Sequence, residues 1–491
     1  MCGIIGIYSQ GPVATPLYDG LIHLQHRGQD AAGIVTDDHL ETPSFHIQRG
    51  LGLVQEIFSA ESVLQLKGQF GIGHTRYPTA GGYQLQDVQP LAMHPSHSLA
   101  LAHNGNLTNA TELGAAFTQQ RQSTIDSELL MLHLAAHLDP ATISGSPALL
   151  FEVLEIAIGK MMQEAQGSYS VLCLLKGAGL IAFRDPHGIR PLVFGERRAA
   201  NGKKDYIFAS ESSMFYSLGF QSSGDVEPGE LVFVDAAGTL RRRRLAHTQF
   251  APCIFEYVYF SRPDSTLDQA SVYRTRVNMG QNLARQWKKE HPQLQPDIVI
   301  PVPFTSNTAA LAFATEIGVR YSEGLYKNPF IGRTFIMGDE KKRSRGVRHK
   351  LTPQKSEIEG KNVLLLDDSL VRGTTSVEIV KMVREYGAKE IYFVLACPPI
   401  KHPCFYGIDM PSRHELIAAN QSVAEIQAHL GVNHLLYLQL DHLVEAVTRE
   451  NPQKIKTPCM ACMNGCYISG TLTEQKIQTL EQQRQKDKVC L

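Results

Sequence analysis

A cysteine stands at the second position of the chain, directly after Met1. Removal of Met1 would leave Cys2 with a free α-amine, whose pKa of about 7.7–8.0 lets a useful fraction accept the thiol proton near neutral pH. One residue would then supply both a nucleophile and its base. A cysteine at this position can also be incidental, so the rest of the chain must decide between the two interpretations.

Four residues further along have the side chains or N–H groups that a substrate of such a nucleophile needs. Arg76 follows a short apolar run and could grip a carboxylate at two points. Asn104 and Gly105 could stabilise an oxyanion through an amide and a backbone N–H. Asp126 opens a predicted helix and could bind an ammonium group. Taken singly, these residues could equally be a surface arginine, a turn and a helix N-cap.

Together with Cys2 and with residues 25–33 (Gln-His-Arg-Gly-Gln-Asp-Ala-Ala-Gly), this set resembles the glutaminase domain of the N-terminal-nucleophile amidotransferases. The resemblance implies a four-layer αββα sandwich in which Cys2 attacks the amide of glutamine. It also implies that the Asn104–Gly105 pair stabilises the tetrahedral oxyanion. Arg76 and Asp126 would hold the α-carboxylate and the α-amine of the substrate.

A second candidate site lies in residues 363–375, Val-Leu-Leu-Leu-Asp-Asp-Ser-Leu-Val-Arg-Gly-Thr-Thr. The carboxylates of Asp367 and Asp368 suit vicinal ribose hydroxyls and Mg²⁺, which demands oxygen ligands. The N–H groups of residues 372–375, with the hydroxyls there and the dipole of the following helix, could cradle a phosphate. The structural alternative is that Asp-Asp-Ser merely caps the next helix.

This stretch is similar to the signature of the phosphoribosyltransferases, which bind 5-phosphoribosyl 1-pyrophosphate with Mg²⁺. Ser306, at the end of an earlier predicted strand, resembles a position that helps to bind Mg²⁺. Residues 327–350 form a basic segment that closes over the phosphates in the family. The implied contacts to the substrate are Ser306, Asp367, Asp368, Ser369, Arg372, Gly373, Thr374, Thr375, Arg333 and Lys350.

The two halves together resemble, nearly end to end, the amidophosphoribosyltransferase family, with further matches at residues 260–264, 327–335 and 405–410. The resemblance implies that ammonia from glutamine displaces pyrophosphate from C1 and gives 5-phosphoribosylamine, the committed step of de novo purine biosynthesis. It also implies feedback inhibition by purine nucleotides and a homotetramer. The alternatives are an amidotransferase with another acceptor, such as a sugar phosphate, and a regulatory protein that has lost its chemistry.

Composition and charge exclude several other classes of protein. The net charge of −1 gives no reason to expect binding to nucleic acid or to a membrane surface. No stretch approaches the roughly 20 apolar residues that cross a bilayer, and the N-terminus lacks the features of a secretory signal. We therefore expect a cytoplasmic protein.

Family members with an iron–sulfur cluster commonly begin with a propeptide, whereas only Met1 precedes Cys2 here. We therefore expect that removal of Met1 alone exposes the cysteine.

The chain has nine cysteines, and we do not expect them to form disulfides, which are rare in the cytoplasm. Cys459 and Cys462 have a two-residue spacing that suits one corner of a metal or cluster site, although two reduced thiols would share it. With Cys253 and Cys404, they match the ligand positions of the family members that carry a [4Fe–4S] cluster. Zn²⁺ in a four-cysteine site is the main alternative.

The pattern of apolar residues changes between residues 245 and 270. Before this point, short apolar runs alternate with Gly-rich turns and with two helical patterns, which indicates sheets covered by helices. After it, predicted strands alternate with predicted helices, which is typical of βαβ units and a parallel sheet. The predicted strands are 297–302, 362–366 and 391–396, and the predicted helices are 271–288, 309–317 and 376–386.

We therefore expect three parts in the chain. Residues 1–250 form a glutaminase domain, and residues 251–450 form a type I phosphoribosyltransferase domain with a parallel sheet. Residues 451–491 form a cysteine-containing segment that packs back on the transferase domain.

Overall fold

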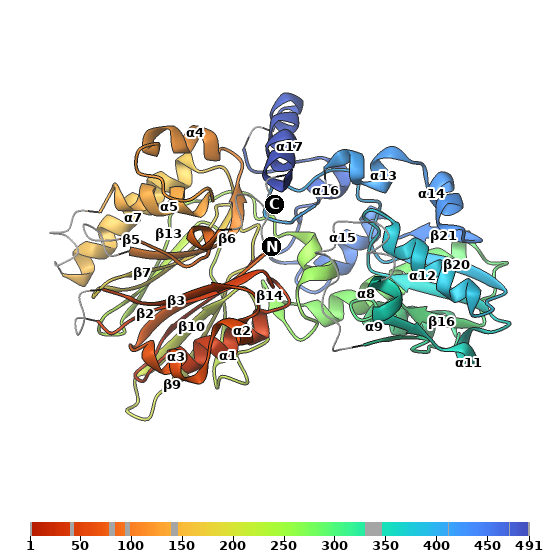
Figure 1. The fold of residues 1–491 in the computed structure, drawn as a ribbon, viewed down its shortest axis with the longest axis horizontal. Coiled ribbons are helices and arrows are strands. Elements are labelled where there is room, and N and C mark those ends of the chain that lie inside the picture. The colour runs from red at the N-terminus through yellow and green to blue at the C-terminus, as the bar shows by residue number, and fades with distance from the viewer. Residues whose placement is uncertain are drawn as a thin grey trace.

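The computed structural model describes residues 2–39, 44–77, 84–93, 99–138, 146–328, 346–410, 412–470 and 472–489. They form two lobes that lie side by side, with both ends of the chain near the junction (Figure 1). The first lobe runs from β1 (Gly3–Tyr8) to β13 (Leu240–Arg244), and the second runs from η3 (Glu256–Phe260) to α15 (Leu440–Thr448). No helix in the described ranges is long and apolar enough to cross a membrane.

Two antiparallel sheets form the centre of the first lobe. The seven-stranded sheet has the order β11-β9-β10-β1-β4-β2-β3, and the six-stranded sheet has the order β13-β12-β8-β7-β6-β5. The remaining strands are β2 (Ala31–Asp37), β3 (His46–Leu51), β4 (Phe70–Arg76), β5 (Leu91–Met93), β6 (Leu99–Leu107), β7 (Gly167–Leu175), β8 (Gly179–Arg184), β9 (Val193–Arg198), β10 (Lys204–Ala209), β11 (Gln221–Asp225) and β12 (Glu230–Asp235).

The sheets stack face to face, with helices on both outer faces (Figure 1). Alternate apolar side chains of the two sheets, such as Phe70 and Leu172, meet in a buried inner core. The outer face of the seven-stranded sheet packs against α1 (Ala14–Leu24), α2 (Val54–Ile57) and α3 (Ala60–Gln65). The six-stranded sheet packs against α5 (Ser127–Ala135) and α7 (Pro147–Glu164). The predicted four-layer αββα sandwich is confirmed.

A parallel sheet forms the centre of the second lobe. Its order is β16 (Ile298–Pro301), β19 (Asn362–Asp367), β20 (Glu390–Leu395) and β21 (His434–Tyr437). The helices α8 (Val272–Glu290) and α9 (Asn307–Ile317) pack on one face, and α12 (Thr374–Glu385) and α14 (Val423–Leu430) pack on the other. The predicted parallel sheet is confirmed, and the six predicted elements lie within a few residues of their observed bounds.

The other α-helices and strands of the described residues are α4 (Ala110–Gly114), β14 (Thr266–Leu267), β15 (Ala270–Ser271), β17 (Leu325–Lys327), β18 (Leu351–Pro353), α11 (Lys355–Ile358), α13 (Ile417–Asn420), α16 (Ala461–Asn464) and α17 (Glu474–Val489). Short 3₁₀ helices lie at Leu85–Asp87, Ala115–Phe117 and Arg413–Glu415.

Buried ion pairs join the two lobes. Arg184, at the end of β8, donates two hydrogen bonds to Asp268 of the second lobe, Nη1 to Oδ1 at 2.7 Å and Nη2 to Oδ2 at 3.0 Å. Arg27 of the first lobe donates through Nη2 to Oε1 of Glu256 at 2.8 Å. Removing one partner of a buried pair leaves an uncompensated charge and costs about 3–5 kcal/mol. These pairs therefore specify how the lobes are arranged.

Candidate active site

Cys2 lies at the start of β1, where the first lobe faces the second. Its backbone N is 3.3 Å from Oδ1 of Asn104, and its Sγ is 3.7 Å from the carbonyl oxygen of Tyr77. The register of β1 against β4, in which Gly3 pairs with Thr75, places Cys2 beside the end of β4. The fold thus places the predicted nucleophile next to Asn104, a predicted oxyanion donor, and next to Tyr77, which directly follows Arg76.

The apolar run before Asn104 ends at Ala102, yet Asn104 and Gly105 lie inside β6. The strand continues to Leu107 because its backbone pairs with β7 along its whole length. Asn104 is fully buried, and its Nδ2 has no hydrogen-bond partner among the described residues. A Cβ on Gly105 would lie 2.0 Å from the carbonyl oxygen of Ser168, so only glycine fits there. A buried amide donor without a partner is costly unless a ligand supplies an acceptor.

The two residues predicted to hold the substrate's charged groups lie at the ends of neighbouring elements. Arg76 is the last residue of β4 and is buried. Asp126 precedes α5, and its Oδ2 accepts a hydrogen bond from the N–H of Leu107 at 2.7 Å. His103 lies 3.8 Å from the other carboxylate oxygen of Asp126, and burial lowers the pKa of His103. A neutral imidazole leaves the charge of Asp126 available for an ammonium group.

A buried arginine that the sequence did not single out also contacts the nucleophile. Nε of Arg27 donates to the carbonyl oxygen of Cys2 at 3.1 Å, and its Nη atoms bond to Glu211 and Glu256. Burial alone would lower the pKa of Arg27, but these two carboxylates more than reverse this. Arg27 belongs to the motif of residues 25–33, and nothing in that motif indicates a partner as distant as Glu256.

The acidic pair of the second lobe lies at the carboxyl end of β19. Oγ of Ser306 donates to Asp367 at 3.2 Å, and Oγ of Ser369 donates to Asp368 at 2.6 Å. Thr305 also donates to Asp368. Burial, followed by the neighbouring charge of Asp368, raises the pKa of Asp367 well above its usual range, and burial raises the pKa of Asp368. A cation is the ligand that would relieve this repulsion.

The predicted phosphate cradle is a tight turn that leads into α12. The helix begins at Thr374, two residues earlier than predicted, so Thr374 and Thr375 form its first turn. Gly373 has a φ of +84°, a left-handed conformation that favours glycine. Nε of Arg372 donates to Glu415 at 3.0 Å, so this side chain is held beside the turn. The turn thus leads from the acidic pair at the end of β19 to the N-terminus of α12, where backbone N–H groups and the helix dipole favour an anion.

The basic segment is only partly described. Arg333 lies outside the described residues. The carbonyl oxygen of Lys350 accepts a hydrogen bond from the N–H of Asn328 at 2.9 Å, which pins the segment where it rejoins β18. Arg348 donates to both carboxylate oxygens of Glu385, at 2.9 and 2.8 Å.

The four cysteines singled out in the sequence converge between the lobes. Cys253 and Cys459 face each other in a parallel bridge, where Cys459 N donates to the carbonyl of Pro252 at 2.9 Å. Cys253, Cys404 and Cys462 are each 5% exposed. Burial raises the pKa of Cys462, and the neighbouring thiols of Cys404 and Cys253 raise it further. Four thiols from three distant segments of the chain therefore share one buried site.

Four cysteine thiolates are a ligand set that suits either an iron–sulfur cluster or Zn²⁺. No three His, Cys, Asp or Glu side chains in the described part of the chain are arranged to hold one metal ion. A structural zinc site takes four ligands with sulfur at about 2.3 Å from the metal, and a [4Fe–4S] cluster is also held by four cysteine thiolates. Among the other cysteines, Cys173 and Cys397 are buried and Cys466 is exposed. Cys490 lies outside the described residues.

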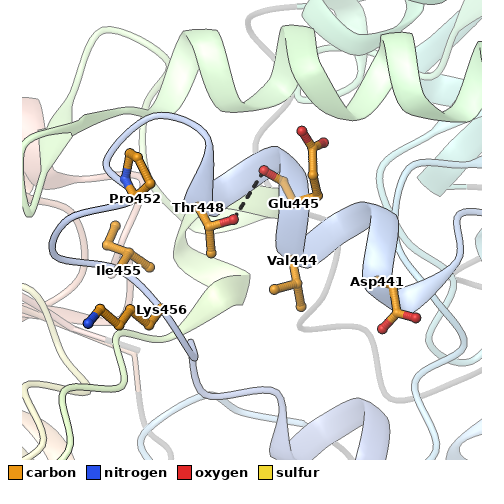
Figure 2. Close-up of a pocket in the computed structure, with 7 residues that line it drawn as sticks. All are labelled: Asp441, Val444, Glu445, Thr448, Pro452, Ile455 and Lys456. Carbon is orange, nitrogen blue, oxygen red and sulfur yellow. Dashed lines mark hydrogen bonds between the residues drawn. The ribbon is translucent and has the colours of Figure 1, made fainter.

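A surface hollow beside α15 contains none of the predicted site residues. Figure 2 shows its lining, which includes Asp441, Glu445 and Thr448 of the helix and Pro452 and Lys456 of the following loop. Its lining contains no nucleophile and no phosphate-binding turn.

The protein resembles known proteins over its whole length. A family model described as glutamine amidotransferase domain matches residues 82–217. Amidophosphoribosyltransferase of Pasteurella multocida is 45% identical and covers 99% of this chain and 96% of that protein. The enzymes of Escherichia coli and Saccharomyces cerevisiae, with the same coverage, are 42% and 40% identical.

Two solved structures share the fold. Glutamine phosphoribosylpyrophosphate amidotransferase from B. subtilis, complexed with ADP and GMP, has a TM-score of 0.83 and 36% identity, and covers 96% of this chain and 98% of that chain. A structure described as the allosteric regulatory enzyme of purine biosynthesis has a TM-score of 0.84 and 36% identity, and covers 98% and 99%. The chain therefore belongs to the amidophosphoribosyltransferase family and is a glutamine-dependent transferase of purine biosynthesis.

Proposed function

We propose that Cys2 hydrolyses glutamine in the first lobe and that the Asp367–Asp368 pair binds 5-phosphoribosyl 1-pyrophosphate in the second. The proposal for the first lobe rests on the contact between the backbone N of Cys2 and Oδ1 of Asn104 at 3.3 Å. Nδ2 of the same asparagine is a buried donor with no partner among the described residues. A tetrahedral oxyanion would supply the missing acceptor.

The residues divide the chemistry of glutamine hydrolysis between them. After Met1 is removed, the α-amine of Cys2 takes the thiol proton, and Sγ attacks the amide carbon. Nδ2 of Asn104 and the N–H of Gly105 stabilise the oxyanion, and the proton held by the amine passes to the departing ammonia. Arg76 binds the α-carboxylate of glutamine and Asp126 binds its ammonium group. Water then releases glutamate from the thioester.

In the second lobe, the acids and the turn bind opposite ends of the sugar phosphate. Asp367 and Asp368 accept hydrogen bonds from the ribose hydroxyls, and the turn of residues 372–375, with Ser369, binds the 5-phosphate. We assign Mg²⁺, which the family generally uses, to the acidic pair and Ser306, because Mg²⁺ takes oxygen ligands and Oγ of Ser306 lies 3.2 Å from the Asp367 carboxylate. The bound ion would neutralise charge on the departing pyrophosphate. Arg333 and Lys350 are proposed as further phosphate contacts.

A glutamine analogue with a diazoketone in place of the amide tests the assignment of the nucleophile. Mass spectrometry of a digest should find one adduct, on the peptide that begins at Cys2, and excess glutamine should slow its formation. The exposed thiol of Cys466 serves as an internal control for non-specific alkylation. Inactivation with an adduct on any other residue would rule out Cys2.

We propose a [4Fe–4S] cluster on Cys253, Cys404, Cys459 and Cys462. Protein purified without oxygen should contain about four iron and four acid-labile sulfide per chain. Cys462→Ser should lose both together with the visible absorbance, whereas Cys466→Ser, which changes an exposed thiol, should keep them. A colourless wild-type protein that holds zinc would contradict the cluster.

The same assignments extend to the division of the chain and to its regulation. We place the glutaminase domain at residues 1–250, the phosphoribosyltransferase domain at 251–450 and the cysteine-containing segment at 451–491, which the end of β13 at Arg244 and the end of α15 at Thr448 support. Purine nucleotides as inhibitors are supported by the ADP and GMP complex of the B. subtilis relative. A homotetramer is proposed from the family resemblance.

A further inference from the structure

A short backbone segment of the second lobe lies directly against the proposed oxyanion site of the first. The carbonyl oxygen of Phe405 accepts a hydrogen bond from Nδ2 of Asn106 at 3.1 Å. The carbonyl oxygen of Tyr406 accepts one from Oγ of Ser168 at 2.9 Å. Asn106 and Ser168 are buried and face each other in β6 and β7. These bonds cross from one lobe to the other without an intervening side chain of the second lobe.

The next residue of the segment touches the backbone of Gly105. A Cβ built on Gly407 would lie 2.9 Å from Cα and from the carbonyl carbon of Gly105, and 3.0 Å from its oxygen. On the other side, a Cβ on Gly105 would meet the carbonyl oxygen of Ser168 at 2.0 Å. Gly105 is therefore held between two backbones, and both glycines are required by the lack of space.

The segment is fixed rather than free to yield. The hydroxyl of Tyr406 donates to the carbonyl of Ser469 at 2.9 Å and accepts from its N–H at 2.8 Å. Oγ of Ser469 in turn accepts from the N–H of Gly167, at the start of β7, at 2.8 Å. The hydroxyl of Tyr467 donates to the carbonyl of Pro403 at 2.7 Å. The C-terminal part of the chain therefore ties residues 403–407 to the strand beside β6.

We propose that residues 405–407 are a positioning element of the glutaminase site, in which the backbone of Gly407 sets the place of the Gly105 N–H. Oxyanion donors act only when they are held where the negative charge develops. The site for glutamine is then incomplete without the second lobe, and a shift of residues 405–407 changes the rate of glutamine hydrolysis. This inference rests on the proposed role of Asn104 and Gly105.

Gly407→Ala tests this role, because the added methyl group must displace Gly105. We expect kcat with glutamine to fall about 10–100-fold, less than the ~10²–10³-fold cost of deleting an oxyanion donor. The KM for glutamine should change less than about threefold, because Arg76 and Asp126 are untouched. Synthesis from added ammonia should stay within about twofold of the wild type, since Gly407 is not among the residues proposed to bind 5-phosphoribosyl 1-pyrophosphate.

Gly431→Ala is the matched control for backbone strain. Gly431 has a φ of +70°, close to the +88° of Gly407, but a Cβ there meets nothing within 4 Å. The control should therefore leave the rates with glutamine and with ammonia unchanged. Equal losses with glutamine and ammonia in Gly407→Ala, no loss at all, or the same selective loss in Gly431→Ala would overturn the inference.

Two further variants keep the test decisive if Gly407→Ala does not fold. Ser168→Ala removes only the bond to the Tyr406 carbonyl, and it should lower the glutamine-dependent kcat about two- to fivefold with ammonia use unchanged. No selective loss in this variant would count against the inference.

Asn104→Ala tests the underlying assignment of the oxyanion donors. If it leaves glutamine hydrolysis intact, the oxyanion role fails. If it lowers glutamine hydrolysis while neither Gly407→Ala nor Ser168→Ala shows a selective loss, only the positioning role fails.

Discussion

Cys2→Ala is expected to lower the glutamine-dependent rate by at least about 10³-fold, since removing a covalent nucleophile costs up to about 10⁶-fold in kcat elsewhere. Synthesis from added ammonia should be retained, because the acidic pair and the phosphate turn belong to the other lobe. The substitution removes Sγ but leaves the backbone N that contacts Asn104 and the carbonyl that accepts from Arg27. The lobes should therefore keep their arrangement.

Steady-state assays of pyrophosphate with glutamine and with ammonium chloride measure this split directly. Cys466→Ala is the matched control, because it removes an exposed thiol outside both sites and should change neither rate. Loss of ammonia-dependent synthesis in Cys2→Ala would mean that the substitution disturbs the fold. Retention of the glutamine-dependent rate would mean that another group attacks the amide.

Asp367→Asn should have the opposite effect to Cys2→Ala, with glutamine hydrolysis retained and synthesis lost. We expect pyrophosphate release to fall by about 10²-fold or more with either nitrogen donor, the scale on which fixed charges stabilise a transferring group. Asparagine keeps the shape that accepts from Ser306 and from the N–H of Asp368, but it lacks the charge that would attract Mg²⁺. Glutamine hydrolysis should persist, because Cys2 and Asn104 are untouched.

Glutamate and pyrophosphate should be measured in the same Asp367→Asn reaction. Asp297→Asn is a suitable control, since Asp297 accepts from the N–H of Asn362 at 2.7 Å, at the opposite end of β19, and is remote from the turn at residues 372–375. Its rates should match those of the wild type. A full pyrophosphate rate in Asp367→Asn would remove the acidic pair from the proposed mechanism.

Motifs in the sequence identified residues that the fold does bring together. Cys2 contacts Asn104, and Ser306 contacts Asp367, although each pair is far apart in the chain. The motifs pointed to these residues because a nucleophile, an oxyanion donor or a phosphate turn restricts which residue types can serve, and their roles stay predictions. Alternating strands and helices likewise predicted the parallel sheet, since each predicted strand was apolar enough to be buried on both faces.

Element bounds were harder to predict. The apolar run of this strand ends at Ala102, whereas β6 continues through His103 to Asn106, because pairing with β7 outweighs their low strand propensity. The helix α7 was not predicted, and its exposed Leu149 and Ile156 blur the apolar periodicity that marks a helix. The strand β21 has only four residues, too few for a pattern.

Contacts between the lobes could not be predicted from the sequence. Arg27 is fully buried between Glu211 and Glu256, whereas charged residues are usually expected at the surface. The approach of Gly407 to Gly105 depends on the packing of two backbones, and neither glycine differs in sequence from one in a loop. Such contacts follow from how the domains dock, which local patterns do not encode.

The central claim is that the nitrogen released at Cys2 is used at the second site. It is tested by comparing the amounts of glutamate and pyrophosphate formed while free ammonia is removed from the solution. Wild-type protein is incubated with glutamine, Mg²⁺, 5-phosphoribosyl 1-pyrophosphate and an excess of an enzyme that consumes ammonia. We predict equal amounts of glutamate and pyrophosphate, as without that enzyme. Glutamate formed without matching pyrophosphate would contradict the account.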